Sequence, residues 1–392
     1  MTRLRLVVLG VMGRLPFAGV AWQALHYLEG FRRLGHEVWY VEDTGAWPFD
    51  VDANAVTADV RYTVDYLSRT LGWAGFTDRW AYCAASEKGR VYGRPESELR
   101  RALERADVLV NVTGATELCP AHARVPVRIY LETDPVLPQI QVALGHASMV
   151  NLLAAHTHHF TFGENIGAPG CEVPAGPFAY QPTRQPVVLD WWPPGRAEPT
   201  VPRRALRFTT VGNWQQREKD VQWRGRTLGW SKDERFERVL DLPRRSAQCF
   251  ELALASVDAT ARARLHAHGW RVRDAVALTK DLQPYRDYLR SSSAEFTVAK
   301  EQNVLLRSGW FSDRSACYLA AGNPVVTEDT GFGRVLPTGR GLFAFRTLDD
   351  VLAAVDAIAT DPAAHAAAAR EIARAHFAAE EVLGELLARA GV

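Results

Sequence analysis

Short apolar runs that end in glycine recur along the chain and predict buried strands. The first run, RLRLVVLG, ends at Gly10 and leads through a glycine-containing loop into an amphipathic helix from about Val20 to Leu34. The run EVWYVED then follows as a second strand. Further strands are predicted at 107–114, 127–134 and 159–164, and helices at 96–106 and 137–155. Strands that alternate with helices are typical of a parallel sheet covered on both faces.

The same order of elements begins again after a proline-rich stretch. Residues 174–202 show neither helical nor strand periodicity, which is typical of a linker. The run LRFTTVGNW then repeats the strand that ends in glycine. Further strands are predicted at 250–256, 295–300 and 323–328, and an alanine-rich helical pattern runs from Leu348 onward.

These elements predict an α/β protein with two Rossmann-like domains that face each other across a cleft. We place the first domain at residues 1–180, a linker at 181–205, and the second domain with its terminal helices at 206–392. Open α/β folds bind their ligands at the carboxyl ends of the strands, so we expect the ligand between the domains.

Composition narrows the class of protein. The chain has 46 Lys and Arg against 45 Asp and Glu, so it lacks the strong positive charge of nucleic-acid-binding proteins. Its five cysteines are dispersed without a CxxC pair, and we expect neither disulfides nor a zinc site. No signal-peptide pattern and no apolar run of membrane-spanning length occur, so we expect a cytoplasmic protein. The richness in alanine and arginine fits a bacterial, GC-rich genome.

The segment 308–333 combines a predicted anion site with a polar turn. Ser312 and Asp313 open a helix, whose free backbone N–H groups and positive dipole end suit a phosphate. Gly322 ends this helix, a short strand follows, and the polar turn TEDTG lies at the carboxyl edge of the predicted sheet. A phosphate site and a polar turn this close together suit a nucleotide linked to a sugar.

The second half resembles glycosyltransferases of the GT-B fold. An arginine at the start of a helix before a Gly-x-Pro-Val turn, here Arg314, Gly322, Pro324 and Val325, is found in the spore-maturation-type, or group 1, subgroup. The resemblance covers roughly residues 206–350. It implies a hexosyltransferase-type enzyme that transfers a sugar from a nucleotide-diphosphate sugar to a small-molecule or glycan acceptor held by the N-terminal domain.

Two departures from the family leave parts of this picture open. Many relatives bind the ribose hydroxyls with a glutamate where this chain has Cys317, and a thiol is a poor substitute for a carboxylate acceptor. The paired glutamates of the retaining enzymes are also missing, so the resemblance does not fix the stereochemistry. A nucleotide-sugar 2-epimerase of the same fold and a non-catalytic two-domain sugar-binding protein remain as alternatives.

Polar residues at strand ends and helix starts are the candidates for the donor site. The planar guanidinium of Arg314 matches phosphate oxygens, and the charge of Lys232 at a predicted helix start is otherwise unfavourable. Carboxylates in the polar turn suit sugar hydroxyls. Each of these residues also has a purely structural explanation, as a turn, a helix start or an exposed loop. The donor-side candidates are Gly212, Asn213, Lys232, Lys300, Ser312, Asp313, Arg314, Ser315, Glu328 and Asp329.

Catalytic and acceptor-side candidates come from the first half. Transfer with inversion requires a base, and Asp134, with Glu132 second, lies at the carboxyl end of a predicted strand. Gly13 and Gly19 are candidates for a loop at the cleft, and their spacing lacks the GxGxxG pattern of dinucleotide-binding oxidoreductases. No Asp-x-Asp motif stands in a metal-binding context. We therefore expect no metal or cofactor, with Arg and Lys side chains and a helix N-terminus stabilising the leaving diphosphate.

Overall fold

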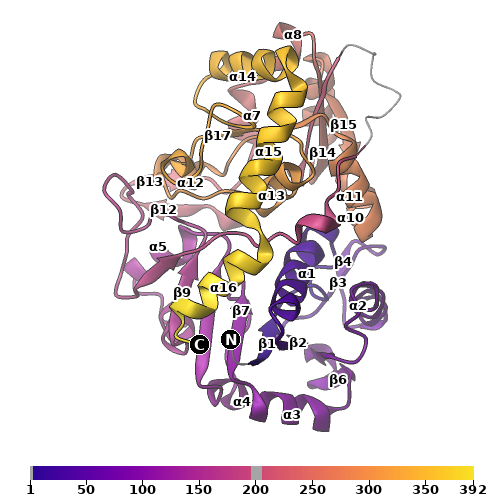
Figure 1. Cartoon of the computed structure of the whole chain (residues 1–392), viewed down its shortest axis with the longest axis vertical. Helices are drawn as coiled ribbons and strands as arrows, with labels where there is room; N and C mark the ends of the chain where they lie inside the picture. The colour runs from indigo at the N-terminus through magenta and orange to yellow at the C-terminus, as the bar shows by residue number, and fades with distance from the viewer. Residues whose placement is uncertain (1–2, 196–204) are drawn as a thin grey trace.

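The computed structural model describes residues 3–195 and 205–392, which form two α/β domains stacked along the long axis of the molecule (Figure 1). The first domain contains an eight-stranded sheet in the order β10-β9-β8-β7-β1-β2-β5-β6, parallel except for the β5–β6 pair. Its strands are β1 (Arg5–Leu9), β2 (Glu37–Glu42), β5 (Trp80–Ala84), β6 (Arg90–Gly93), β7 (Val108–Val112), β8 (Val127–Glu132), β9 (His158–Thr161) and β10 (Tyr180–Pro182).

The helices of the first domain cover both faces of this sheet. They are α1 (Ala18–Arg33), α2 (Arg61–Trp73), α3 (Glu96–Arg105), α4 (Pro120–Ala123), α5 (Leu137–Ala143) and α6 (Ala147–Ala154), and a small hairpin is formed by β3 (Phe49–Asp50) and β4 (Ala55–Val56). The sequence predicts one helix over 137–155, but the structure has two. Gly145 lies between them with φ +78°, a conformation that ends a helix.

The second domain contains a six-stranded parallel sheet in the order β15-β14-β11-β16-β17-β18. Its strands are β11 (Arg207–Asn213), β14 (Cys249–Ala255), β15 (Arg271–Asp274), β16 (Ala294–Thr297), β17 (Val325–Glu328) and β18 (Leu342–Phe345), and β12 (Val221–Trp223) pairs with β13 (Arg226–Leu228) in a separate hairpin. Its helices are α7 (Asp233–Glu237), α8 (Leu242–Arg245), α9 (Ala259–Ala267), α10 (Ala275–Thr279), α11 (Leu282–Ser291), α12 (Glu301–Leu305), α13 (Asp313–Ala320), α14 (Leu348–Thr360) and α15 (Pro362–Phe377).

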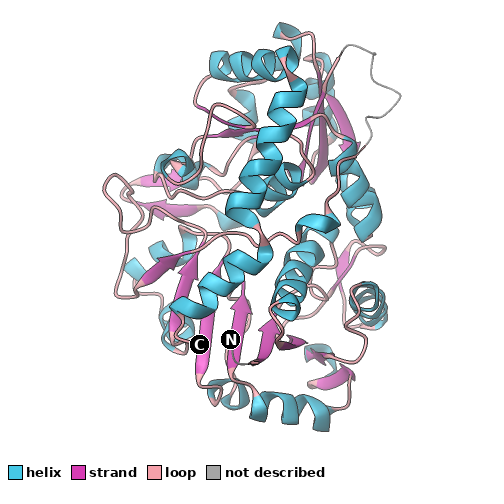
Figure 2. Ribbon diagram, in the orientation of Figure 1, coloured by secondary structure: helices cyan, strands magenta, loops and turns pink. Residues whose placement is uncertain are grey.

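The predicted fold class, two parallel sheets in two α/β domains with C-terminal helices, is confirmed. Strand arrows of the first sheet point toward the second domain in Figure 2. The strands missed by the sequence are short or lie toward sheet edges, among them β6, β10, β15 and β18. Such short runs contain too few residues to show the alternation of apolar and polar positions by which a strand is recognised. Among the described residues, none of the helices combines the length and the hydropathy that a membrane span requires.

The last helix, α16 (Ala379–Arg389), packs on the first domain although the sequence assigns it to the second. Figure 1 shows α15 along the second domain and α16 beside the first sheet. Gly30 of α1 allows this contact, because a Cβ there would lie 2.5 Å from Leu383 Cδ1. Leu383 is buried in the same apolar core as α1. The boundaries at 1–180, 181–205 and 206–392 stay a prediction, and residues 196–204 of the linker lie outside the described residues.

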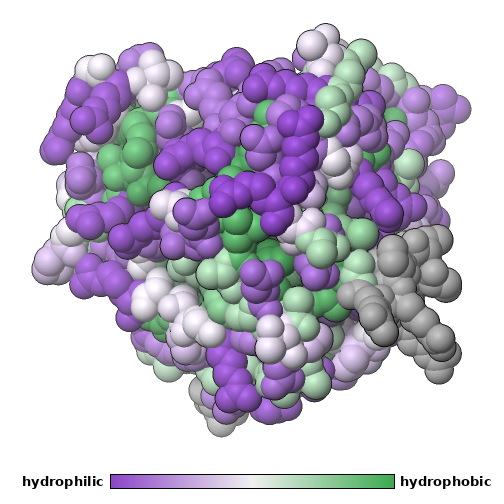
Figure 3. All heavy atoms as spheres, turned by 90° about the horizontal axis from the view of Figure 1, so that it is seen from above, coloured by the Kyte–Doolittle hydropathy of each residue, from purple (hydrophilic) through white to green (hydrophobic). Residues whose placement is uncertain are grey.

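Apolar packing joins the two domains as well as filling each one. Trp22 of α1 lies in one cluster with Trp192 of the linker and with Tyr285 of α11, so this cluster draws on both domains. The ring centres of Trp22 and Trp192 are 5.0 Å apart. Figure 3, a view onto the end of the molecule, shows a largely hydrophilic surface with hydrophobic residues visible between the polar ones.

Candidate functional site

The carboxyl edges of the two sheets meet at the domain boundary. Asp134, just after β8, forms an ion pair with Lys300, just after β16. Asn165, just after β9, donates from Nδ2 to the carbonyl oxygen of Gly331 after β17 at 3.0 Å. Trp310 Nε1 donates to the carbonyl oxygen of Thr133 at 2.9 Å. Two of the predicted site residues, Asp134 and Lys300, are therefore in direct contact across the boundary.

Lys300 is held between an acid and an aromatic face. Its Nζ atom lies 3.4 Å from the centre of the Trp230 ring, a cation–π geometry. Burial lowers the pKa of Lys300, and the neighbouring Asp134 carboxylate opposes this effect. The pair keeps one positive and one negative charge at the meeting edges of the sheets.

Lys232 is a positive charge near this boundary that forms no ion pair among the described residues. It is half-buried at the start of α7, and within residues 3–195 and 205–392 its side chain has no hydrogen-bond or ion-pair partner. Burial, followed by the nearby charge of Arg314, lowers its pKa to about 7. An ammonium group placed in this way gains strongly from a bound anion, because the anion would supply the missing countercharge.

Arg314 lies at the start of α13 as the sequence predicts, but each of its three guanidinium nitrogens already donates a hydrogen bond to the protein. Nε donates to Glu295 Oε1 at 2.6 Å, Nη1 to the carbonyl oxygen of Val211 at 2.6 Å and Nη2 to Thr297 Oγ1 at 3.1 Å. These acceptors belong to β11 and β16, so Arg314 ties α13 to the sheet. Its predicted role as a phosphate ligand stays a prediction.

The N-terminal turn of α13 is largely enclosed. Ser312 makes no side-chain cap, and the hydroxyl of the fully buried Ser315 has no hydrogen-bond partner in the described part of the chain. Asp313 is half-buried, and burial raises the pKa of its carboxyl. Cys317, at the position expected to face ribose, is only 4% exposed. The space beside it, between Trp22 and Tyr285, measures about 10 Å³, too little for a sugar ring.

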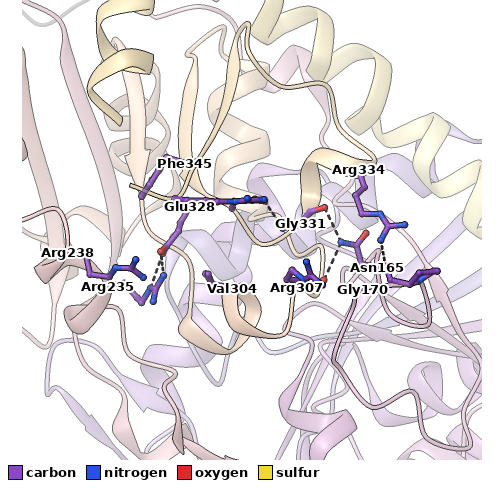
Figure 4. Close-up of a pocket in the computed structure, with 13 residues that line it drawn as sticks. Asn165, Gly170, Arg235, Arg238, Val304, Arg307, Glu328, Gly331, Arg334 and Phe345 are labelled. Carbon is purple, nitrogen blue, oxygen red and sulfur yellow. Dashed lines mark hydrogen bonds and ion pairs between the residues drawn. The ribbon is translucent and has the colours of Figure 1, made fainter. Parts of the chain in front are cut away.

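A far larger cavity, of about 470 Å³, lies along the carboxyl edge of the second sheet (Figure 4). Asn165 and Gly170 of the first domain line one side, so the cavity adjoins both domains. Two of its arginines have no side-chain hydrogen-bond or ion-pair partner among the described residues, namely Arg238 and Arg307. Its arginines are Arg235, Arg238, Arg307, Arg334 and Arg346. A cavity with this lining favours an anionic ligand.

Glu328 and Asp329, predicted to bind sugar hydroxyls, both line this cavity but are bonded within the protein. Glu328 forms a buried ion pair with Arg235, their side chains being 4% and 6% exposed. Asp329 pairs with Arg346 at 2.7 Å and accepts from the backbone N–H of Gly331 at 2.8 Å. Their carboxylates hold the cavity walls in place, and a direct contact with sugar stays a prediction.

Glu132 and Asp134 have very different surroundings. Glu132 is 1% exposed and accepts hydrogen bonds from Thr161 Oγ1 and Gln139 Nε2, both at 2.6 Å. Burial raises its pKa to about 8, so Glu132 is protonated at neutral pH. The Asp134 side chain is 45% exposed. Access to solvent and substrate therefore favours Asp134 over Glu132 as a base.

The four glycine and asparagine candidates divide into tight and open positions. Gly13 donates its N–H to Glu42 Oε2 at 2.6 Å, and a Cβ there would lie 2.8 Å from Thr63 Cγ2. Gly19 lies beside Tyr285 in the small space near Cys317. Gly212 has open space around it, and Asn213 is exposed. Gly13 thus has a structural function that the sequence did not reveal, whereas Gly212 and Asn213 leave room for a ligand.

Comparisons with known proteins identify the fold. No protein-family model matches the chain, and no curated protein matches it. Among solved structures, a sucrose-phosphate synthase from Thermosynechococcus elongatus is 12% identical with a TM-score of 0.59, covering 99% of each chain. An alpha-glucosyltransferase in complex with UDP-glucose and DNA containing an abasic site is 10% identical with a TM-score of 0.57 over 100% of both chains.

A third structure, Anabaena HepE in complex with UDP and glucose, is 11% identical with a TM-score of 0.55 and covers 98% of this chain and 100% of its own. These similarities extend over both domains and not just the second half, where the sequence resemblance lies. The chain therefore has the two-domain GT-B fold of glycosyltransferases.

Proposed function

We propose that the protein is a glycosyltransferase that takes a sugar from a nucleotide-diphosphate sugar. The observation that carries this proposal is a set of cations without ion-pair partners among the described residues. Lys232 lies beside the Asp134–Lys300 pair where the sheets meet. Arg238 and Arg307 line the adjoining cavity. A diphosphate supplies the anion that these side chains lack. The full-length similarity to glycosyltransferase structures supports the same reaction class.

The leaving diphosphate is assigned to Lys232 and the arginine cavity. Lys232 and Arg235 belong to one short stretch around α7, and Lys300 and Arg307 flank α12, so the cluster and the cavity share two elements. Cleavage of the bond between sugar and phosphate leaves negative charge on the diphosphate. Cations already fixed in a partly buried site stabilise this charge as it develops.

The acceptor is assigned to the first domain, with Asp134 as the base. Asp134 lies at the carboxyl edge of the first sheet and is accessible, while its contact with Lys300 keeps it beside the donor side. In transfer with inversion, Asp134 would remove the proton from the acceptor hydroxyl as that oxygen attacks the sugar carbon.

Replacing Lys232 tests the donor assignment. We expect Lys232→Met to lower kcat/KM for the nucleotide-sugar by about 100-fold, the scale found when one charge-stabilising group is removed. Because the pKa of Lys232 is about 7, donor affinity of the wild type should fall as pH rises through 7 and the ammonium loses its proton. Steady-state assays measure the change in kcat/KM, and titration calorimetry with a panel of nucleotide-sugars, from pH 6 to pH 9, measures the change in donor affinity.

Two further variants make this test specific. Lys232→Arg should retain part of the affinity and lose its pH dependence near 7, because a guanidinium stays protonated. Lys280→Met removes a partly exposed lysine that pairs with Asp52, and should change neither the donor affinity nor its pH dependence. Unchanged donor affinity and turnover in Lys232→Met would show that the diphosphate binds elsewhere. Binding of free sugar without any response to the diphosphate would instead indicate a sugar-binding protein.

A further inference from the structure

Three side chains of types that bind metals meet in the first domain. Asp43 follows β2, and Cys119 and His122 lie at the start and third position of α4. One possible ligand atom from each lies within 4.8 Å of the others. Among residues 3–195 and 205–392, this is the only group of three or more potential ligands that comes together in this way.

The imidazole of His122 is the least explained member of the group. His122 is 1% exposed, yet neither ring nitrogen makes a hydrogen bond within the described residues. Asp43 Oδ2 lies 3.9 Å from His122 Nε2, too far for a hydrogen bond. Buried polar atoms nearly always have a hydrogen-bond partner or a bound ion. A buried imidazole without one therefore suggests a ligand that binds to it.

The local fold brings these ligands together in a fixed geometry. Cys119 is the N-cap of α4, Pro120 starts the helix, and His122 follows three positions after the cysteine. Residues three apart in a helical turn lie on one face, so Cys119 and His122 both point toward the same side. Asp43 comes from the sheet, because it directly follows Glu42, the last residue of β2.

The set of donor atoms selects the kind of metal. A thiolate, an imidazole and a carboxylate are ligands of tetrahedral Zn²⁺, at about 2.3 Å from sulfur and about 2.0–2.2 Å from nitrogen and oxygen. Such bond lengths place ligand atoms roughly 3.3–3.8 Å apart, so the 3.9 Å between Asp43 and His122 needs little contraction. Ca²⁺ and Mg²⁺ prefer oxygen ligands alone, which this site does not offer.

We propose that Asp43, Cys119 and His122 form a binding site for one Zn²⁺ ion, with water in the fourth position. The thiol of Cys119 releases its proton to solvent when the metal binds. The ion would fasten α4, which lies between β7 and β8, to the end of β2. The site is independent of the proposed glycosyl transfer, because none of its residues belongs to the donor cluster or the arginine cavity.

Metal titration of the full-length protein tests the proposal. After removal of metals with a chelator under reducing conditions, the wild type should bind one Zn²⁺ per chain in competition with a chromophoric chelator. Co²⁺ in place of Zn²⁺ should give visible bands typical of tetrahedral coordination and an ultraviolet thiolate-to-metal band. Cys119→Ser should abolish the ultraviolet band and weaken Zn²⁺ binding by at least about 100-fold, because loss of a partner that only orients a ligand already costs up to that much and Cys119 is a direct ligand.

A second ligand variant and a matched control complete the test. Asp43→Asn barely changes the shape of the side chain, and should weaken Zn²⁺ binding by about tenfold or more while the thiolate band persists. Cys249→Ser alters a cysteine in the other domain and should leave both readouts unchanged. The proposal is overturned if the wild type binds no stoichiometric Zn²⁺, or if Cys119→Ser and Asp43→Asn, both folded by circular dichroism, bind it as the wild type does.

Discussion

Asp134→Asn is expected to lower kcat by about 10²–10⁴-fold, the contribution usual for a positioned general base. An amide has nearly the shape of the carboxylate but cannot take up the acceptor proton. Asp134 is the accessible acid on the first domain's side of the boundary, in contact with Lys300. Because its assigned role lies in the chemical step, the KM for the nucleotide-sugar should change much less than kcat.

Glu132→Gln is the matched control for this experiment. Glu132 is protonated at neutral pH and accepts hydrogen bonds from Thr161 and Gln139, and an amide oxygen can accept both of them. Its kcat should stay close to that of the wild type. Steady-state assays of both variants, with released nucleoside diphosphate as the readout, separate the two acids. If Glu132→Gln loses activity while Asp134→Asn keeps it, the base is Glu132.

Arg314→Met is expected to cost about 3–5 kcal/mol of folding free energy, the loss typical when one partner of a buried ion pair is removed. Glu295 is completely buried, and its Oε1 atom accepts from Arg314 Nε at 2.6 Å. Without Arg314, the carboxylate would be left in the interior without a countercharge. The carbonyl of Val211 would lose its hydrogen bond to the same guanidinium.

A double variant distinguishes this structural role from a role in phosphate binding. Replacing both charges, as in Arg314→Met with Glu295→Leu, should restore much of the lost stability, because no uncompensated charge remains. Urea unfolding followed by tryptophan fluorescence measures the stability of each variant. If the stable double variant binds nucleotide-sugar as the wild type does, Arg314 is structural alone. A large loss of affinity at restored stability would show that it also holds phosphate.

Much of the fold could be predicted because its strands are regular apolar runs. Positions at strand ends were recognised individually, and Asp134 and Lys300 are examples. Their contact could not be predicted, since it depends on how the two domains are placed. The same limit applies to the arginine cavity, whose residues come from α7, α12 and the segments after β9, β17 and β18. No local pattern links these segments.

Side-chain direction was the other quantity that the sequence did not supply. Arg314 was predicted at a helix start, where a guanidinium can turn toward the ligand or toward the sheet. Its direction is decided by Glu295, a buried acid inside β16 whose side chain the sequence alone did not place. The proposed zinc ligands show a related limit, because residues far apart in the sequence meet only in the folded chain. Cys119 and His122 have a short spacing, but Asp43 lies far away in sequence and is brought close only by the sheet.

The return of α16 to the first domain has a mechanical consequence. The chain crosses between the domains near Val187 and again near Ala378, and the two crossings are bonded to each other. Val187 N–H donates to the carbonyl oxygen of Phe377 at 2.7 Å, and Ala379 N–H donates to that of Val187 at 3.0 Å. The two chain segments that connect the domains are hydrogen-bonded to each other at this point. This arrangement restricts sliding and twisting of one domain relative to the other. Any opening between the two domains is therefore a rotation about the contact between Val187 and Ala378. The domain surfaces farthest from this contact would move the most.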